Sequence, residues 1–381
     1  RNIALHHAGA DGRTAKYHAG DRVAAVRVLI AGGGTGGHIM PALAIADALQ
    51  KQYQSELLFV GTPRGLESRL VPQAGHRLEL IQVGQLKNVS LATRVRTMLD
   101  LPMSVLHCRK LLKQFHPNVV VGVGGYASGP AMVAAIIAHI PTLAVEPNAF
   151  PGLANRLVGK HISAAAVNFE PALRFFRNAQ VTGIPVRTEF FNLKPRPEDA
   201  PPHLLIFGGS QGARVLNRTM PQIVARLLDA IPGLTILHQA GSRHAEETQA
   251  AYTASGTDPT RWQVHAFLDD MAKRFEAADL VLSRSGASTV AEEMAAGKPA
   301  LLVPFPGAAD DHQRKNAEVM AGAGAARMLI ESEMTPERLL ESLTGMLKDR
   351  AELRSMGDRV RILAHPDAAA QIAKMTAGLA K

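Results

Sequence analysis

The order apolar segment, glycine-rich turn and helical segment occurs twice in this sequence, and it restricts the possible fold more than any other feature. The first copy has an apolar stretch at 26–31, a turn at 32–38 and a helical pattern at 41–50. The second copy has an apolar stretch at 204–207 and a turn at 208–213, again followed by a helical pattern. Short apolar strands that alternate with helices are typical of a parallel sheet with both faces covered.

Further apolar segments extend this pattern through both halves. They predict strands at 57–60, 119–123, 141–145, 234–238, 280–283 and 299–303. A chain of 381 residues is long enough for two domains of about 150 residues each. The sequence therefore predicts an α/β protein with two doubly wound, parallel-sheet domains. Ligands of such folds bind at the carboxyl ends of the strands, so we expect the site in a cleft between the domains.

A proline-rich segment separates the two halves. Four prolines fall within 194–202, and because each proline fixes φ and lacks an N–H group, the segment predicts a stiff extended linker. We expect an N-terminal domain at 26–186, a C-terminal domain at 187–363, and a helix at about 364–381 that packs back on the N-terminal domain. Residues 1–25 show neither periodicity nor the apolar core of a signal peptide, and we expect a disordered extension there.

Charge and composition narrow the classes of ligand. The chain carries 42 Lys and Arg residues against 33 Asp and Glu residues, so its net charge is +9 and its surface attracts anions. Aromatic residues make up only 4%, and no run interleaves them with basic residues, which disfavours nucleic acid as a partner. No apolar run reaches the roughly 20 residues of a membrane-spanning helix. The single cysteine, Cys108, excludes a disulfide framework and a cysteine-based zinc site.

The first glycine turn, residues 32–37, suits an anion. Glycines let backbone N–H groups approach a phosphate, and the N-terminus of the following helix adds further N–H groups. The spacing also fits the dinucleotide fingerprint, but that fingerprint needs an acidic residue at the end of the second strand, and 59–62 has none. A tight turn without a ligand is the other alternative. His38 is either a general base, since imidazole titrates near neutral pH, or a residue that only hydrogen-bonds within the turn.

Two further motifs lie in the second half. The second glycine turn, residues 208–213, has no Gly-Lys-Ser/Thr sequence, so it is not a Walker loop. The segment 284–292 combines small residues with Glu292, whose carboxylate either accepts two ribose hydroxyls or is an acid favoured by the helix dipole. The acidic pairs at 269–270 and 310–311 resemble metal ligands, but a hard cation needs more oxygen ligands than lie nearby, and we expect no metal.

These motifs resemble those of one known family, the MurG glycosyltransferases of peptidoglycan synthesis, from about residue 26 to the C-terminus. The matching segments are Gly33-Gly34-Thr35-Gly36-Gly37-His38 with Pro41, Gly124-Gly125-Tyr126 with Ser128-Gly129-Pro130, Gly208-Gly209-Ser210-Gln211-Gly212-Ala213, and Arg284-Ser285-Gly286-Ala287 with Thr289 and Glu292. The resemblance implies a GT-B fold, in which two Rossmann-like domains face each other across a cleft. It implies an inverting transfer of GlcNAc from UDP-GlcNAc to the 4-hydroxyl of MurNAc in lipid I, which gives lipid II and UDP without a cofactor.

The resemblance also assigns residues to each substrate, with His38 as the catalytic residue. For the donor UDP-GlcNAc it implies contacts with Thr35, Gly36, Gly37, Asn148, Arg187, Ser210, Gln211, Ala287, Ser288, Thr289, Glu292, Gln313 and Asn316. For the acceptor it implies contacts with Gly36, Gly37, Gly125, Tyr126, Ser128 and Glu146. The chain departs from the family where Val145-Glu146-Pro147-Asn148 replaces the common His-Glu-Gln-Asn, so the roles of that histidine and glutamine do not carry over.

A lipid-linked acceptor implies contact with a membrane. The resemblance places the chain as a peripheral protein on the cytoplasmic face of the bacterial inner membrane, with lipid I, the anionic membrane surface and other cell-wall synthesis proteins as partners. The segment 91–115 mixes apolar and basic side chains in a way that suits an anionic bilayer, although a helix packed on the core gives the same spacing. These side chains are Leu91, Val95, Met98, Leu99, Leu101, Val105 and Leu106 beside Arg94, Arg96, Arg109, Lys110 and Lys113.

Other classes of protein remain open at this point. The nearest are another GT-B enzyme that uses a UDP-sugar with a lipid acceptor, and a UDP-GlcNAc 2-epimerase, because the missing histidine at position 145 loosens the match. A non-enzymatic alternative is a basic module that binds a nucleotide or a membrane and has lost turnover. The presence of both His38 and Glu292 argues against that alternative.

Overall fold

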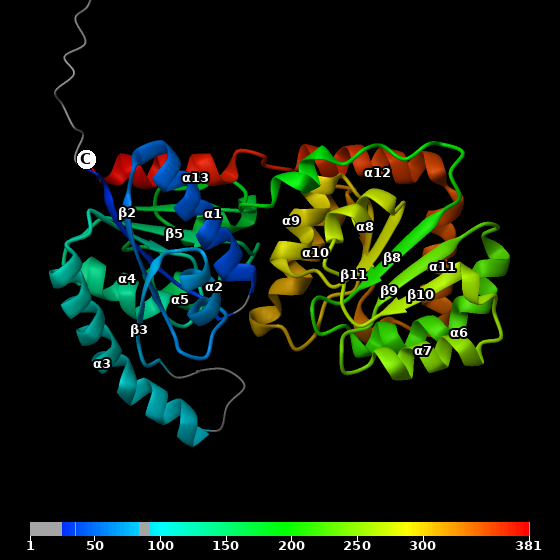
Figure 1. Cartoon of the computed structure of the whole chain (residues 1–381), viewed down its shortest axis with the longest axis horizontal. Helices are drawn as coiled ribbons and strands as arrows, with labels where there is room; N and C mark the ends of the chain where they lie inside the picture. The colour runs from blue at the N-terminus through cyan, green and yellow to red at the C-terminus, as the bar shows by residue number, and fades with distance from the viewer. Residues whose placement is uncertain (1–24, 35, 84–90, 381) are drawn as a thin grey trace, which may run out of the picture.

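The computed structural model describes residues 25–34, 36–83 and 91–380, with only the backbone described for 91–99. Within these residues the chain forms two lobes that lie side by side, each built around one sheet (Figure 1). The expected extension at 1–25 lies outside the described residues except for Ala25, and Thr35 of the first glycine turn lies outside them as well.

The N-terminal lobe contains a seven-stranded sheet with the strand order β3-β2-β1-β4-β5-β6-β7, and every neighbouring pair is parallel. Its strands are β1 (Arg27–Ala31), β2 (Glu56–Gly61), β3 (Arg77–Leu80), β4 (Val119–Gly122), β5 (Thr142–Glu146), β6 (Ala164–Val167) and β7 (Ala179–Val181). Its helices are α1 (Gly36–Tyr53), α2 (Glu67–Gln73), α3 (Leu91–Phe115), α4 (Ser128–Ile137), α5 (Leu153–Val158) and the 3-10 helix η1 (Glu170–Phe175). The central strands β1, β4 and β5 are mostly apolar and buried because helices cover both of their faces.

The C-terminal lobe repeats this plan with a six-stranded sheet in the order β10-β9-β8-β11-β12-β13, again parallel throughout. Its strands are β8 (His203–Phe207), β9 (Thr235–Gln239), β10 (Trp262–His265), β11 (Leu280–Ser283), β12 (Ala300–Leu302) and β13 (Ala326–Met328). Its helices are α6 (Arg214–Ala230), α7 (Ala245–Ala254), α8 (Met271–Ala277), α9 (Ala287–Ala296), α10 (His312–Gly322), α11 (Pro336–Lys348) and α12 (Arg350–Ile362). Short 3-10 helices are η2 (Thr188–Asn192), η3 (Pro259–Arg261), η4 (Ala309–Asp311) and η5 (Glu331–Glu333). The predicted fold class, two doubly wound parallel-sheet domains, is confirmed.

Strand order reverses once in each sheet. In the N-terminal lobe β1 pairs with β2 on one side and with β4 on the other, and in the C-terminal lobe β8 pairs with β9 and β11. The loops after β1, β4, β8 and β11 carry the four motifs found in the sequence. Connections on either side of such a reversal leave toward opposite faces of the sheet, which opens a crevice for a ligand.

The predicted strands correspond to β1, β2, β4, β5, β8, β9, β11 and β12, but five other strands were missed. Four of these, β3, β7, β10 and β13, are the edges of the two sheets. Edge strands are short and carry polar residues, so they lack a strong apolar signal. The fifth, β6, reads Ala-Ala-Ala-Val, and it is a strand because of its buried position between β5 and β7. Helix α1 also begins at Gly36, inside the glycine turn, rather than at residue 41.

The chain crosses between the lobes twice. After α12 in the C-terminal lobe it returns to the N-terminal lobe, where α13 (Ala368–Leu379) packs against α1, β4 and β5 (Figure 1). The two crossing segments meet at Gly183, which has φ +70° and where an added Cβ would lie 2.4 Å from the Cβ of His365. The return of the chain end therefore ties both lobes together close to the point where they are first connected.

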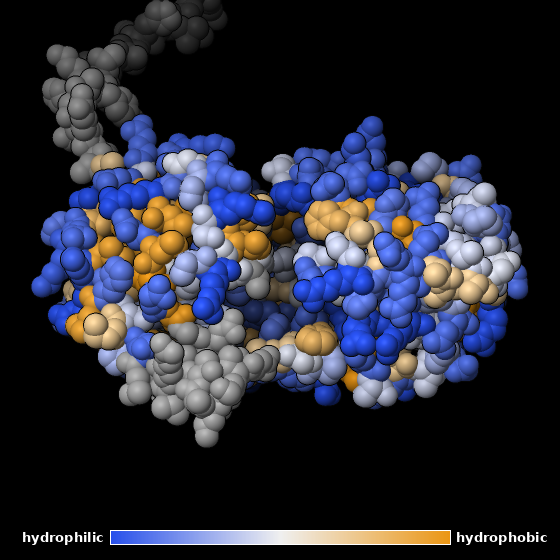
Figure 2. All heavy atoms as spheres, turned by 60° about the horizontal axis from the view of Figure 1, so that its bottom comes forward, coloured by the Kyte–Doolittle hydropathy of each residue, from blue (hydrophilic) through white to orange (hydrophobic). Residues whose placement is uncertain are grey.

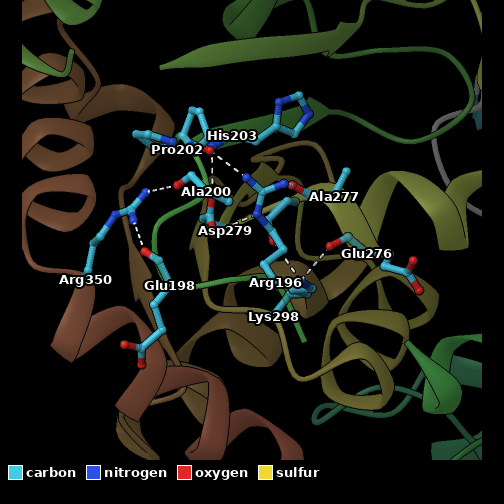
Figure 3. A network of polar contacts seen from close by, with 12 residues as sticks. Arg196, Glu198, Ala200, Pro202, His203, Glu276, Ala277, Asp279, Lys298 and Arg350 are labelled. Atoms are coloured by element: carbon cyan, nitrogen blue, oxygen red, sulfur yellow. Dashed lines mark hydrogen bonds and ion pairs between the residues drawn. The ribbon is translucent and has the colours of Figure 1, made fainter. Parts of the chain in front are cut away.

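The proline-rich linker is not uniformly extended, contrary to the expectation, because a turn forms where the Ala200 N–H donates to the Pro197 carbonyl. Two arginines hold the linker on the C-terminal lobe (Figure 3). Arg196 donates to Asp279 Oδ1 at 3.1 Å and to the carbonyls of Ala277 and Pro201. Arg350 of α12 donates to the carbonyls of Glu198 and Ala200. Carbonyl groups of the linker thus accept hydrogen bonds from two guanidinium groups, and the linker forms part of the surface of the C-terminal lobe.

We expect Arg196→Met to lower the free energy of unfolding of the C-terminal lobe by about 1–3 kcal/mol, because three charge-assisted hydrogen bonds are lost while the aliphatic part of the side chain is kept. The single tryptophan, Trp262, lies in β10, so its fluorescence during urea unfolding reports on this lobe. Arg338→Met, at an exposed ion pair with Glu333, is the control and should change stability by less than about 0.5 kcal/mol. Equal effects of the two substitutions would contradict a stabilising role of Arg196.

Candidate functional site

A hollow lies between the two lobes (Figure 2). An ion pair joins the two lobes, in which Arg156 of α5 approaches Asp310 of the opposite lobe at 2.9 Å. The Arg156 guanidinium also lies over the ring of Phe150, 4.7 Å from its centroid. Asp310 and Asp311 both have left-handed backbone, with φ of 54° and 55°. Such conformations are uncommon for residues other than glycine, and they often occur at functional sites.

The first glycine turn packs closely against the loop after β4. Gly32, Gly33 and Gly34 all have positive φ, and the turn lies against the loop after β4. An added Cβ at Gly125 would lie 2.2 Å from the Gly33 carbonyl oxygen, and one at Gly124 would lie 2.8 Å from the His38 ring. The two glycine clusters of the N-terminal lobe therefore lie in backbone contact, which no larger residue would permit.

His38 lies in the first turn of α1 and is partly buried. Burial lowers the pKa of His38, and the nearby His312 lowers this pKa further, while Glu67 of α2 raises it. A lowered pKa leaves the imidazole neutral near pH 7, which is the form that a general base requires. His312 donates through Nδ1 to the Ala309 carbonyl at 2.6 Å, which leaves its Nε2 as an acceptor in the neutral ring.

In the C-terminal lobe the small residues after β11 form the N-terminus of α9. The helix begins at Ala287, and Ser288 and Thr289 complete its first turn, whose N–H groups lack helical acceptors. Such an end binds anions through these N–H groups and the helix dipole. The structure therefore places Ala287, Ser288 and Thr289 at a helix end suited to an anion, and their contact with a diphosphate stays a prediction.

Glu292 lies one turn further along α9. Arg187 reaches it from the segment between the lobes, with 3.7 Å between Nη2 and Oε1. Burial raises the pKa of Glu292 to about 7, although the Arg187 charge opposes this rise. The carboxyl group is therefore only partly ionised near neutral pH, and hydroxyl donors that favour the carboxylate would shift it to the ionised form.

Two buried charged residues had no role assigned from the sequence: Arg284, the first residue of this motif, and Glu293, which follows it. Glu293 is fully buried, accepts a hydrogen bond from Ser283 Oγ at 2.7 Å, and has a pKa that burial raises to about 8. Arg284 is also buried and donates to the carbonyls of Val303 and Pro304. These residues hold the loop after β11 against the loop after β12. Only burial distinguishes them from exposed charges, and burial is not visible in the sequence.

The second glycine turn presents Ser210 and Gln211, which are both exposed. The backbone below them is packed tightly, since an added Cβ at Gly212 would lie 1.8 Å from the Ala240 carbonyl oxygen. Gln239 at the end of β9 donates to the Gly209 carbonyl at 3.2 Å. The turn is thus fixed by its neighbour strand, and its two polar side chains point away from the core.

Asn316 of α10 joins the lobes. This side chain is fully buried, its Oδ1 accepts from the Ala149 N–H at 2.8 Å, and its Nδ2 donates to Asn148 Oδ1 and to the Ser285 carbonyl, both at 3.1 Å. In this structure the carboxamide assigned to GlcNAc is therefore engaged by protein groups. Gln313 accepts from the Phe305 N–H through Oε1 at 2.9 Å.

The residues assigned to the acceptor differ in exposure. Tyr126 is 41% exposed, whereas Ser128 and Glu146 are only 1% and 2% exposed. Glu146 accepts from the N–H groups of Asn148 and Gly152 and from two side-chain amides, so it orders the loop after β5. Burial raises the Glu146 pKa, and these hydrogen bonds oppose the rise. Ser128 and Glu146 thus lie beneath the surface of the site, and any direct contact of either with a ligand stays a prediction.

The acidic pairs considered as metal ligands have other contacts. Asp310 pairs with Arg156 across the lobes, and Asp270 pairs with Arg274 one turn into α8 at 2.9 Å. Among the residues that the structure describes, no group of three or more His, Cys, Asp or Glu side chains is arranged to hold a metal ion.

The sequence matches two family models in order. Residues 28–167 match the glycosyltransferase family 28 N-terminal domain, and residues 203–372 match the glycosyltransferase family 28 C-terminal domain. Similar full-length proteins carry one common name, UDP-N-acetylglucosamine–N-acetylmuramyl-(pentapeptide) pyrophosphoryl-undecaprenol N-acetylglucosamine transferase. The protein of that name from Solibacter usitatus is 41% identical over 359 residues, which cover 94% of this chain and 97% of the relative. The protein from Myxococcus xanthus is 38% identical over 359 residues, or 93% of each chain.

Solved structures agree with this relationship. MurG from Acinetobacter baumannii matches with a TM-score of 0.80 at 33% identity, over 93% of this chain and 99% of that chain. A UDP-GlcNAc 2-epimerase from Neisseria meningitidis matches with a TM-score of 0.65 at 12% identity, over 93% and 100% of the two chains, which shows a shared fold only. Together with the GT-B arrangement of its two sheets, these similarities establish that this chain belongs to the MurG family of glycosyltransferases.

Proposed function

We propose that this chain transfers GlcNAc from UDP-GlcNAc to the 4-hydroxyl of MurNAc in lipid I, which yields lipid II and UDP. Relatives named for this transfer cover more than nine-tenths of the chain and support the proposal. One observation of the site carries it. His38 lies within electrostatic range of His312 at the N-terminus of α10, and Asn316 of α10 hydrogen-bonds to the loop before α9. A base from one lobe thus meets an anion-binding helix end from the other.

The donor is held by the C-terminal lobe. The N–H groups of the first turn of α9 bind the diphosphate of UDP-GlcNAc, and the exposed Ser210 and Gln211 of the second glycine turn lie on its other side. Glu292 accepts two ribose hydroxyls in its ionised form, and Arg187 favours that form. Gln313 and Asn148 border the sugar. These roles rest on the family resemblance and on the places of the residues around one helix end.

The acceptor is held by the N-terminal lobe. Its pyrophosphate binds at the N-terminus of α1, where Gly36 and Gly37 let the ligand approach the backbone. Gly125 and Tyr126 line the neighbouring loop after β4, and Tyr126 is exposed. The MurNAc 4-hydroxyl then lies next to His38, between the two lobes.

The reaction is a single in-line displacement. The acceptor oxygen forms a bond to C1 of GlcNAc while the bond between C1 and the diphosphate oxygen breaks, and the configuration at C1 inverts. His38 takes the proton of the 4-hydroxyl, and UDP leaves with the electron pair of the broken bond. The negative charge that develops on UDP is stabilised by the N–H groups and dipole of α9.

The lipid tail of the acceptor requires a membrane-facing surface, and α3 supplies one. The helix packs on the core through Cys108, Leu112 and Phe115, while Met103 and Leu106 are 66% and 53% exposed. The exposed cations Arg109, Lys110 and Lys113 follow in the next turns. Apolar anchors beside cations suit an anionic bilayer surface. The side chains of Leu91, Arg94, Val95, Arg96, Met98 and Leu99 lie outside the described residues.

The N-terminal lobe shows a hydrophobic area bordered by hydrophilic residues, which supports a contact with a membrane surface (Figure 2). Because lipid I is the proposed acceptor, we place the chain on the cytoplasmic face of the bacterial inner membrane, where lipid I and other cell-wall synthesis proteins are within reach. No helix in the described part of the chain is long and apolar enough to cross a membrane.

The proposed reaction is tested with radiolabelled UDP-GlcNAc and a lipid I analogue that has a short soluble lipid. We expect the label to appear in the analogue, and UDP to be released in equal amount. His38→Ala should lower kcat by about 10²–10⁴-fold, the usual contribution of a general base, with little change in the Kd for UDP-GlcNAc. The exposed His161 is the control, and His161→Ala should be as active as the wild type. Near-normal turnover of His38→Ala would contradict the assignment of the base. The proposed transfer would be contradicted if the C2 epimer of GlcNAc were released as a free product, or if no label appeared in the analogue.

The affinity for UDP-GlcNAc should depend on pH through Glu292. Since its pKa is about 7, the carboxylate fraction rises from about one-tenth at one pH unit below that value to about nine-tenths at one unit above it. If only the carboxylate binds ribose, the Kd should fall about 10-fold over this interval. UDP-GlcNAc is a suitable probe because its diphosphate has no ionisation near pH 7. Calorimetry should show that Glu292→Gln removes the pH dependence and that Glu246→Gln, at an exposed carboxyl, keeps it. A pH-independent wild type would rule out this role.

Binding to anionic vesicles should depend on the exposed face of α3. The double variant Met103→Glu/Leu106→Glu places two carboxylates against the bilayer surface, and we expect at least about a 10-fold loss in partitioning. Ile362→Glu is the matched control, because Ile362 is 81% exposed but lies in the C-terminal lobe. Co-sedimentation at low and high salt measures the effect, and turnover of a soluble acceptor should be unchanged in both variants. Equal partitioning of both variants would exclude α3 as the contact.

A further inference from the structure

A buried carboxyl group lies directly beneath the first glycine turn. Glu67 is the first residue of α2 and is only 1% exposed. Its Oε2 accepts from the Gly34 N–H at 2.6 Å, and its Oε1 accepts from both the N–H and the hydroxyl of Thr62 at 2.9 Å. One side chain thus joins the loops after β1 and β2. Buried carboxylates are uncommon unless their oxygens are satisfied in this way.

Three glycines make room for this carboxyl group. An added Cβ would lie 2.2 Å from Glu67 Cδ at Gly33, 2.4 Å from Cγ at Gly61, and 2.0 Å from Oε2 at Gly65. Gly33 also has positive φ, but Gly61 and Gly65 have backbone conformations open to any residue. At those two positions the space taken by Glu67 is the reason for glycine. The loops after β1 and β2 are therefore built around Glu67.

The hydrogen bond between Glu67 and Gly34 limits which backbone N–H groups of the glycine turn are available to a ligand. The Gly34 N–H points down to Glu67 and is not available to an anion in the cleft. The opposite side of the turn is held by the loop after β4, where Gly125 meets the Gly33 carbonyl. The turn is thus clamped between a carboxylate and a second backbone, and the N–H groups left for a phosphate are those of the first turn of α1.

We propose that Glu67 is a positioning residue for glycosyl transfer, which fixes the first glycine turn and through it the N-terminus of α1 with His38. This inference rests on the function proposed above for the same cleft. Glu67 touches neither substrate and acts through the backbone of Gly34. Its charge has a second effect, because it raises the pKa of His38, while burial and His312 lower that pKa. One buried carboxylate therefore controls both the place and the basicity of the proposed base.

The conservative substitution Glu67→Gln separates these effects from folding. Glutamine has the same shape, but its amide nitrogen is a donor, so its one remaining oxygen can accept from only one of the Gly34 and Thr62 N–H groups. A misplacement of about 1 Å at a reacting group typically lowers the rate about 10²-fold. We expect kcat/KM for the lipid I analogue to fall by about that factor, while the Kd for UDP-GlcNAc stays within about twofold, because the donor binds the other lobe. The control Glu79→Gln, at a surface ion pair with Arg77 in the neighbouring strand β3, should keep full activity.

The pH profile provides a readout that a purely structural role would not change. Loss of the Glu67 charge lowers the His38 pKa, so the acidic limb of the kcat/KM profile should move to lower pH in Glu67→Gln. Among the described residues His312 also acts on the pKa of His38, and the same shift should persist in a His312→Gln background. An unchanged limb together with unchanged kcat/KM for the acceptor would overturn the proposal.

A double-mutant cycle tests the packing directly. Gly65→Ala should be strongly disruptive in the wild type, because the new methyl group would overlap Glu67, and nearly neutral in a Glu67→Ala background. Amide hydrogen exchange of residues 40–45, which hold the first N–H groups bonded within α1, supplies a readout that does not need turnover, and it should accelerate at least about 10-fold in Glu67→Gln. If the wild type failed to transfer GlcNAc but this exchange still accelerated, the proposed function would fail and the positioning role would stand. Unchanged exchange, or equal effects of Gly65→Ala in both backgrounds, would refute the positioning role.

Discussion

A doubly wound parallel sheet sends its connections to opposite faces on either side of the point where strand order reverses, and the loops at that point diverge. The reversals here lie between β1 and β4 and between β8 and β11. Most groups proposed to act on substrate, among them His38, Tyr126, Ser210 and Glu292, follow one of these four strands, whereas Asn148 follows β5. The chemistry therefore depends on a topological constraint that both lobes share. Because carboxyl ends of parallel strands lie at one edge, the two sets of loops meet across a single cleft.

Close backbone approach is the second condition, and it explains where glycine is required. Gly125 lies against the Gly33 carbonyl, and Gly212 lies against the Ala240 carbonyl, so each lobe fixes its glycine turn by contact with a neighbouring loop. Contacts of this kind restrict the backbone of the turn, and this restriction fixes the position of the helix that follows. The lobes differ in what lies beneath the turn, since the N-terminal lobe has the buried Glu67 there. The duplicated scaffold thus supports two turns for which we propose different ligands.

Burial sets the electrostatics of the cleft more than any ion pair does. It lowers the pKa of His38, raises that of Glu292 to about 7, and raises that of Glu293 to about 8. The pKa values of the two glutamates are brought close to neutrality, which suits a group that gains or loses a proton, whereas the lowered pKa of His38 keeps its imidazole neutral and able to accept one. The partner charges, Glu67 for His38 and Arg187 for Glu292, oppose the effect of burial in each case. In both residues, therefore, the effect of burial is partly offset by a nearby group of opposite charge.

The sequence by itself determined the alternation of buried strands and helices, the two glycine turns, and the chemical type of His38 and Glu292, because these depend on local composition and spacing. It could not give the edge strands, the start of α1 within its glycine turn, or the turn in the linker, since neighbouring elements decide these. Only the tertiary structure showed that Asn316 is engaged by both lobes and that Glu67 lies under Gly34, 33 residues away in the chain. The sequence identifies a glutamate but does not show what surrounds its side chain. Its burial, its partners and its role follow from which loops the fold brings around it.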